Sequence, residues 1–331
     1  MMPLNIHSGA CGRELPLMLN SPFAATGSVT VQMAQALTVS ELSLISVSLK
    51  LRPSVASQLE FGAITASASN EAMARAWLDG SWDFVAGGMF DDVWDQKRNV
   101  VPSFKIPSSW RLDRSFDWGS SAPFSVGWWA QSDGSDLELD DGRVVSTVRG
   151  DLFRVREWYG WTGRPNEGKR MLAVDVAKGI VEREILWGWR TQDTCRVKAG
   201  PADSAIYTVE NGVCIAHDML SPVRLDGQIY KGVSWTPADK RPGSRKLGWE
   251  MMRKLIRNAQ PNPEGPRELP GLFVVERECK QFLRTVVSLS RDEKDLDDVD
   301  DKAEDHIGDE TRYRVRAVGS GARSGSAVGM Y

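Results

Sequence analysis

The fold is decided by three segments in the middle of the chain: RLDRSFDWG at 111–119, APFSVGWWAQ at 122–131 and LFRVREWYGW at 152–161. The first segment alternates polar and apolar residues as a strand does, and the second is apolar enough to be central in a sheet. A Gly-Ser-Ser turn separates these two, and a polar, acidic stretch at 132–142 forms a hairpin tip or insertion before the third. We therefore predict three strands in an antiparallel meander.

The downstream sequence alternates helical and strand patterns. The order predicts an α/β fold with a mixed sheet, in which the antiparallel meander is extended by crossover strands and flanked by helices. The expected elements are a helix within 169–187 with Leu172, Val176, Ile180 and Ile185 at helical spacing, a short strand running into a loop in 195–207, a basic helix over Arg241–Asn258 with Leu247, Met251 and Leu255 on one side, a buried strand at 271–276, a helix in 277–289 and a final helix over Ala303–Val315.

The N-terminal part differs from the rest, being rich in Ala, Ser, Leu and Val and poor in charge and aromatic residues. The stretch 70–84 reads as a short amphipathic helix stopped by Gly80. We predict an atypical N-terminal segment over 1–71, a connecting segment over 72–109, one large domain over 110–316 and a flexible Gly/Ser/Ala-rich tail over 317–331.

Composition excludes several classes of protein. The 331 residues are 41% hydrophobic and 26% charged, as in an ordinary globular protein. The four cysteines form no CxxC pair, which argues against structural zinc and suits a reducing cytoplasm. No apolar run is long enough to span a bilayer. The net charge of −3 is mild evidence against DNA binding. Lys and Arg nevertheless crowd 240–257 while Asp and Glu crowd 292–310, which is compatible with a basic face beside an acidic metal site.

Two aspartates follow predicted strands. Asp117 ends the first strand before a glycine turn, with Phe116 and Trp118 pointing to the opposite face and becoming buried. Asp117 could simply initiate the turn, and Asp113, which has the same strand parity, is a rival. Asp203, in AGPADSAI, could equally cap the turn or helix that follows.

A third group of candidates opens the final helix, in KAEDHIGDETRY. Asp305 and Asp309 share a helix face, and His306 is a possible metal ligand. The alternative is a solvated acidic helix start favoured by the helix dipole. If the three groups converge, they form a site for hard divalent cations: two such ions roughly 3.5–4 Å apart promote phosphodiester cleavage.

Five segments in order resemble the nuclease half of phage terminase large subunits, over about 72–316. They are ARAWLDGSWDFVAGGMF, RSFDWGSSAPFSVGWWA, AGPADSAIY, GLFVVERECKQFLRT and EDHIGDETRY. The resemblance implies an RNase H-like nuclease that cuts concatemeric double-stranded viral DNA during genome packaging in the bacterial cytoplasm. It also implies a portal protein and a small terminase subunit as partners, and two Mg²⁺ or Mn²⁺ ions as cofactors.

Carried over to this sequence, the resemblance makes Asp117 the first-strand ligand that bridges both ions and Asp203 the second carboxylate. The third ligand is Asp309, His306 or Asp305, in that order of preference. Phosphate contacts are expected from basic residues, although a solvated helix face is the alternative for many of them. These candidates are Lys240, Arg241, Arg245, Lys246, Arg253, Lys254 and Arg257.

The sequence departs from the family in lacking a recognisable motor domain. No GxxxxGK[ST] loop is present, and SPFAATGSVT lacks the lysine that reaches the phosphates. ATP hydrolysis is therefore not expected of this chain. Two alternatives remain open: a non-catalytic prophage remnant that docks to the packaging complex, and an RNase H-like resolvase or transposase nuclease.

Overall fold

The computed structural model describes residues 87–209, 212–262 and 265–320. Their helices are α3 (Gln96–Asn99), α4 (Ala173–Leu186), α5 (Ile215–Leu220), α6 (Ser244–Asn258), α7 (Lys280–Thr285) and α8 (His306–Ser320), with a 3-10 helix at Ser204–Tyr207. Their strands are β1 (Val100–Val101), β2 (Arg111–Asp117), β3 (Ser125–Gln131), β4 (Leu137–Glu138), β5 (Val144–Val145), β6 (Leu152–Tyr159), β7 (Pro201–Ala202), β8 (Val223–Leu225), β9 (Gln228–Tyr230), β10 (Thr236–Pro237) and β11 (Leu272–Val275). The predicted N-terminal segment, the helix at 70–84 and most of the tail lie outside these residues.

A seven-stranded mixed sheet organises the fold, in the order β1-β11-β6-β3-β2-β7-β10. Its centre is the predicted meander, because β2 pairs antiparallel with β3, and β3 antiparallel with β6. Parallel strands extend both sides: β11 pairs with β6 and β1 with β11, while β7 pairs with β2 and β10 with β7. The predicted α/β class and the crossover extension of the meander are confirmed.

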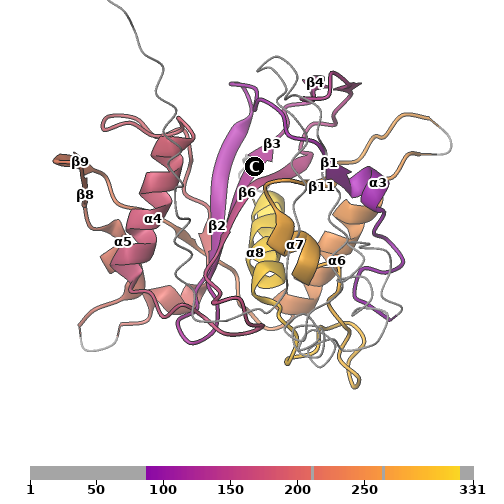
Figure 1. The fold of residues 1–331 in the computed structure, drawn as a ribbon. Helices are drawn as coiled ribbons and strands as arrows, with labels where there is room; N and C mark the ends of the chain where they lie inside the picture. Colours follow the sequence, from indigo (N-terminus) through magenta and orange to yellow (C-terminus); the bar gives the residue numbers. More distant parts are fainter. Residues whose placement is uncertain (1–86, 210–211, 263–264, 321–331) are drawn as a thin grey trace, which may run out of the picture. The chain divides into compact units, whose positions relative to one another are not determined.

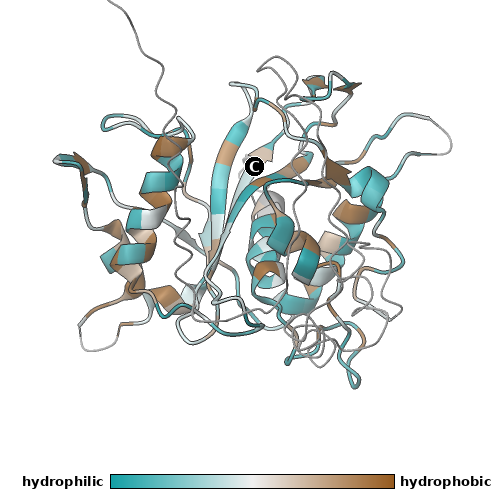
Figure 2. Cartoon of the chain, in the orientation of Figure 1, coloured by the Kyte–Doolittle hydropathy of each residue, from teal (hydrophilic) through white to brown (hydrophobic). Residues whose placement is uncertain are grey.

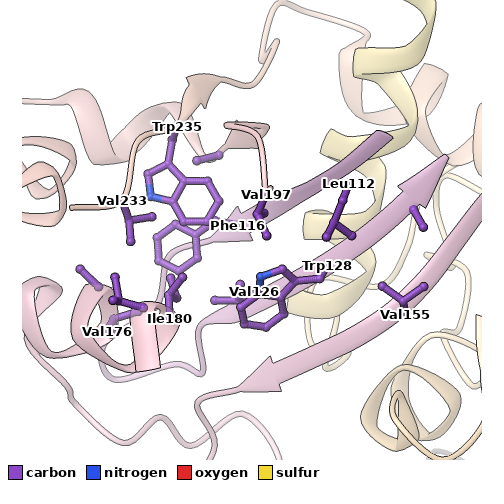
Figure 3. Packing of buried hydrophobic residues seen from close by; sticks show 14 of the residues in the cluster. Leu112, Phe116, Val126, Trp128, Val155, Val176, Ile180, Val197, Val233 and Trp235 are labelled. Carbon is purple, nitrogen blue, oxygen red and sulfur yellow. The ribbon is translucent and has the colours of Figure 1, made fainter. Parts of the chain in front are cut away.

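Helices cover both faces of the sheet (Figure 1): α4 and α5 pack on one, and α6, α7 and α8 on the other. Successive side chains of a strand point to opposite faces of the sheet, so the strands contribute to two hydrophobic cores, one under each layer of helices. Towards α4, Phe116 stacks on Trp235 with ring centroids 5.0 Å apart, beside Trp128 and Ile180 (Figure 3). The burial predicted for Phe116 is confirmed, and Trp118 is partly buried against the same core.

The basic helix is amphipathic, as its alternating polar and apolar colouring shows (Figure 2). Its buried residues include Trp249, Met252 and Ile256, whereas Leu247 on the expected apolar side is 53% exposed. The inward face is therefore turned from the one that the Leu247, Met251 and Leu255 spacing indicated. The tryptophan fills the space against α8, and Gly248 lets the Arg312 side chain of α8 pass close to the α6 backbone.

Residues 87–109, within the predicted connecting segment, contribute to the domain itself. Val100 and Val101 form β1 at one edge of the sheet, and Met89 and Phe90 are buried in the core under α6 and α7. The final helix begins at His306 rather than at Ala303. None of the helices in the described part of the chain combines the length and apolar character that a membrane span requires.

Candidate metal and nuclease site

Asp117 and Asp203 lie side by side at one edge of the sheet. Phe116 pairs in parallel with Ala202, and the Asp203 amide donates to the Phe116 carbonyl at 3.0 Å. Each aspartate follows its paired residue by one position, so both emerge at the carboxyl ends of parallel strands. The sheet thereby brings together two carboxylates that are 86 positions apart in the sequence.

The first turn of α8 joins them. His306 Nδ1 lies 3.5 Å from Asp117 Oδ2, and the Tyr313 hydroxyl donates to Asp117 Oδ1 at 3.3 Å. Asp309, on the same helix, is close enough that its charge acts on Asp117. All three groups that the sequence singled out thus meet around Asp117.

The surroundings of Asp117 disfavour the charged form of its carboxylate. Its burial, together with the charges of Asp309 and Asp203, raises its pKa to about 7 although His306 opposes the shift. Burial alone lowers the pKa of His306, but Asp117, Asp305 and Asp309 outweigh that effect and raise it. Burial and the same acidic surroundings raise the pKa of Tyr313, so its phenol stays protonated and donates.

The rival Asp113 has a different role. It is buried, and Arg314 of α8 donates to it from Nε at 2.6 Å and from Nη2 at 2.9 Å. Arg111 adds a third contact at 2.7 Å. This bidentate ion pair fastens α8 to the sheet, and it leaves Asp117 as the strand carboxylate with no arginine partner among the described residues.

Asp203 caps the 3-10 helix with one carboxylate oxygen and also lies beside Asp117. Its Oδ1 accepts from the Ala205 amide at 2.8 Å, which begins the 3-10 helix, and Lys240 Nζ lies 2.5 Å from the same oxygen. The capping alternative is therefore correct for one oxygen. No described residue hydrogen-bonds to Oδ2.

The acidic and basic segments contact each other through Arg245 and Lys246 of α6. Six of the seven phosphate-contact candidates form an ion pair with an acidic side chain, and two of them, Arg245 and Lys246, pair with the 292–310 segment. The pairs are Lys240 with Asp203, Arg241 with Asp239, Arg245 with Asp298, Asp305 and Asp309, Lys246 with Asp295, Arg253 with Asp92, and Lys254 with Glu250.

Two site-supporting residues were missed by sequence reasoning. Tyr313 could have been found, since it lies four positions after Asp309 on the same helical face. Glu310 could not, because a glutamate in an acidic run reads as solvated. It is fully buried, forms an ion pair with Arg154 of β6, and accepts from Trp129 Nε1 at 3.0 Å and from the Ser115 hydroxyl.

A groove of about 780 Å³ lies on the Tyr313 side of the candidate ligands, none of which lines it. Tyr313, which contacts Asp117, forms part of its wall together with Pro201, Thr236 and Arg316. Arg241 and Arg316 also line it and share the Asp239 carboxylate, at 2.8 and 2.6 Å. Two arginines converging on one carboxylate could instead hold a phosphate, which offers the same kind of acceptor.

The donor set suits a hard cation. No group of three or more His, Cys, Asp or Glu side chains in the described ranges is arranged so that it could hold a metal ion directly. Mg²⁺, however, is commonly bound through one or two carboxylates and keeps several waters. Such an ion would stabilise the charged form of Asp117, whose pKa is raised by burial and by the nearby Asp309 and Asp203 charges. It could also bind Oδ2 of Asp203, to which no described residue hydrogen-bonds.

Solved structures with a similar fold are phage terminases. The large terminase of a thermophilic bacteriophage in complex with ADP matches with a TM-score of 0.46 and 16% identity, over 70% of this chain and 45% of that one. The large terminase nuclease domain of P22 matches with a TM-score of 0.44 and 16% identity, over 70% of this chain and 93% of that domain. The large terminase nuclease of the thermophilic phage G20c, solved with bound cobalt, matches with a TM-score of 0.39 and 10% identity.

The chain thus spans about half the length of the first of these terminases and almost all of an isolated nuclease domain. Both matches cover 70% of this chain, whose described part contains a seven-stranded mixed sheet flanked by helices. At these identities the likeness concerns the fold alone. No protein-family model and no curated protein sequence matches the chain.

Proposed function

We propose that this chain is a metal-dependent DNA endonuclease of the terminase type, which cuts concatemeric double-stranded viral DNA during packaging in the bacterial cytoplasm. The observation that carries the proposal is the meeting of Asp117, Asp203 and the first turn of α8 at the carboxyl ends of two parallel strands. The portal protein and a small terminase subunit are its proposed partners.

Asp117 and Asp203 would hold the divalent cation, with a third ligand from α8. His306 already contacts Asp117, whereas Asp305 and Asp309 each lie against Arg245, at 3.0 and 3.4 Å. A bound Mg²⁺ or Mn²⁺ would supply Lewis-acid stabilisation of the phosphodiester and activation of water. The chain itself would position the carboxylates, because Tyr313 contacts Asp117, and Arg245 contacts Asp305 just before α8 and Asp309 in its first turn.

The substrate would approach through the groove that Tyr313 lines, where Arg241 and Arg316 can exchange Asp239 for a DNA phosphate. The arginines of the groove would contact the phosphate backbone of the DNA rather than its bases, so we expect little sequence specificity.

The proposal is tested by plasmid cleavage with Mn²⁺ or Mg²⁺. Wild-type protein should nick or linearise plasmid, and Asp117→Asn should lower the rate at least 100-fold, since the amide removes the charge that holds the cation. The matched control is Asp193→Asn, at an exposed aspartate outside the set of candidate ligands, which should cleave like wild type. Equal cleavage by wild type and Asp117→Asn would reject the assignment, and binding to portal protein without cleavage would favour the non-catalytic alternative.

A further inference from the structure

Lys240 is the one lysine in contact with the candidate ligands among the described residues. Its ammonium lies 2.5 Å from Asp203 Oδ1 and 5.7 Å from the centre of the Tyr313 ring. Tyr313 in turn contacts Asp117. Lys240 thus contacts one strand-end carboxylate, Asp203, and lies near the tyrosine that contacts the other, Asp117.

The sheet places this lysine there. β10 pairs in parallel with β7, and the Ala238 amide donates to the Ala202 carbonyl at 2.8 Å. Lys240 follows two positions later, at the edge where Asp203 emerges. The side chain is 40% exposed, so it reaches this carboxylate from solvent rather than being packed there by a core.

Charge balance limits how many further cations the site can take. Asp117, Asp203, Asp305 and Asp309 are the carboxylates, and three permanent cations already face them: Lys240 on Asp203, Arg245 on Asp305 and Asp309, and Arg312 on Asp309 at 2.9 Å. Arg245 is also shared with Asp298 at 2.7 Å. With that carboxylate included, the two negative charges that remain are offset by one divalent ion. A second ion beside Asp203 would meet the ammonium at close range and be repelled.

We propose that Lys240 takes the cation position beside Asp203, so that the carboxylate site binds one divalent ion, and that its ammonium contacts the DNA phosphate. This inference rests on the proposed function and departs from the two ions that the family resemblance implies. A lysine can serve here because its ammonium is a compact charge that binds phosphate as a point charge.

The test counts Mn²⁺ ions bound to the full chain by isothermal titration and electron paramagnetic resonance. The ions of this site are those that Asp117→Asn abolishes. Wild type should bind one such ion. Lys240→Met, which keeps the stem and loses the charge, should bind two, and Lys240→Met combined with Asp203→Asn should return to one. Lys240→Arg retains a cation and should stay at one.

Lys246→Met is the matched control, because Lys246 forms a similarly exposed ion pair with Asp295 outside the carboxylate site. It should leave the count at one. Two Asp117-dependent ions in wild type, or one in Lys240→Met, would overturn the role of Lys240 while leaving an Asp117-dependent nuclease intact. No Asp117-dependent ion in wild type would reject the proposed metal site and this inference together.

Discussion

A single side chain, Asp117, carries much of the chemistry that we propose. It is 6% exposed, has no arginine partner among the described residues, and lies among other carboxylates. A buried carboxylate in such surroundings holds a proton more tightly than an ordinary aspartate. Proton and metal ion therefore compete for Asp117, and this competition should be visible in solution.

The apparent affinity for Mn²⁺ should tighten as the pH rises from about 5.5 to about 7 and level off above it, since the pKa of Asp117 is about 7 and ligands must be deprotonated to bind metal. Titration calorimetry in buffers of different ionisation enthalpy should detect proton release at pH 6 that fades at pH 8.

The stability of the metal-free protein should change with pH in the opposite direction to the Mn²⁺ affinity. A carboxyl group whose pKa is higher in the folded state than the unfolded value of about 3.9 binds more protons when folded. Its contribution to the stability of the metal-free protein is thus present at low pH and lost as the pH rises from about 4 to about 7. A Mn²⁺ affinity that does not change with pH would contradict the environment that we describe for Asp117.

Among the secondary structure elements, α8 decides whether the site exists. It carries His306 and Asp309 towards Asp117, and it is fixed to the sheet by Glu310 on Arg154 and by Arg314 on Asp113. Gly127 on β3 makes room for this, since a side chain there would meet the Glu310 carboxylate. The helix is thus held by buried charges rather than by apolar packing alone.

Glu310→Gln should lower the free energy of unfolding by about 3–5 kcal/mol, because removing one partner of a buried ion pair leaves the Arg154 charge uncompensated. Urea denaturation measures this loss. The control is Glu278→Gln, whose partner Arg156 lies 2.8 Å away in a half-exposed pair, and it should cost less than about 1 kcal/mol. Similar losses in both variants would mean that the buried pair does not anchor α8.

Across the domain, the charges are arranged so that cations and anions are mostly paired, which explains why a mildly acidic chain could still bind DNA. The acidic 292–310 segment pairs with Arg245 and Lys246 of α6. The groove that Tyr313 lines is also lined by Arg241 and Arg316, which share one aspartate. DNA binding should therefore depend on a few residues at this groove.

Arg241→Ala should weaken binding of a short duplex in Ca²⁺ and reduce the slope of log K against log salt by about one, as expected for a lost phosphate contact. Fluorescence anisotropy across a salt series measures both. Arg143→Ala is the control, because Arg143 forms the same kind of exposed pair with an aspartate two positions earlier but lies away from the groove. If both variants lose affinity equally, the groove is not the path of the DNA.

The amino-acid pattern was sufficient for the meander, the added strands β7 and β11, most helices and the placement of Asp117 and Asp203 next to strand ends, while their role as ligands stays a prediction. These follow from local periodicity and from the rule that carboxyl ends of parallel strands meet at one edge of a sheet. The pattern could not predict which face of α6 is buried or that Glu310 is buried. Nor could it predict the ion pairs of Asp113 with Arg314 and of Lys240 with Asp203. Each of these depends on which charges and ring systems come together when distant segments pack, and an ionised side chain in a sequence carries no sign of whether it will meet solvent or a partner.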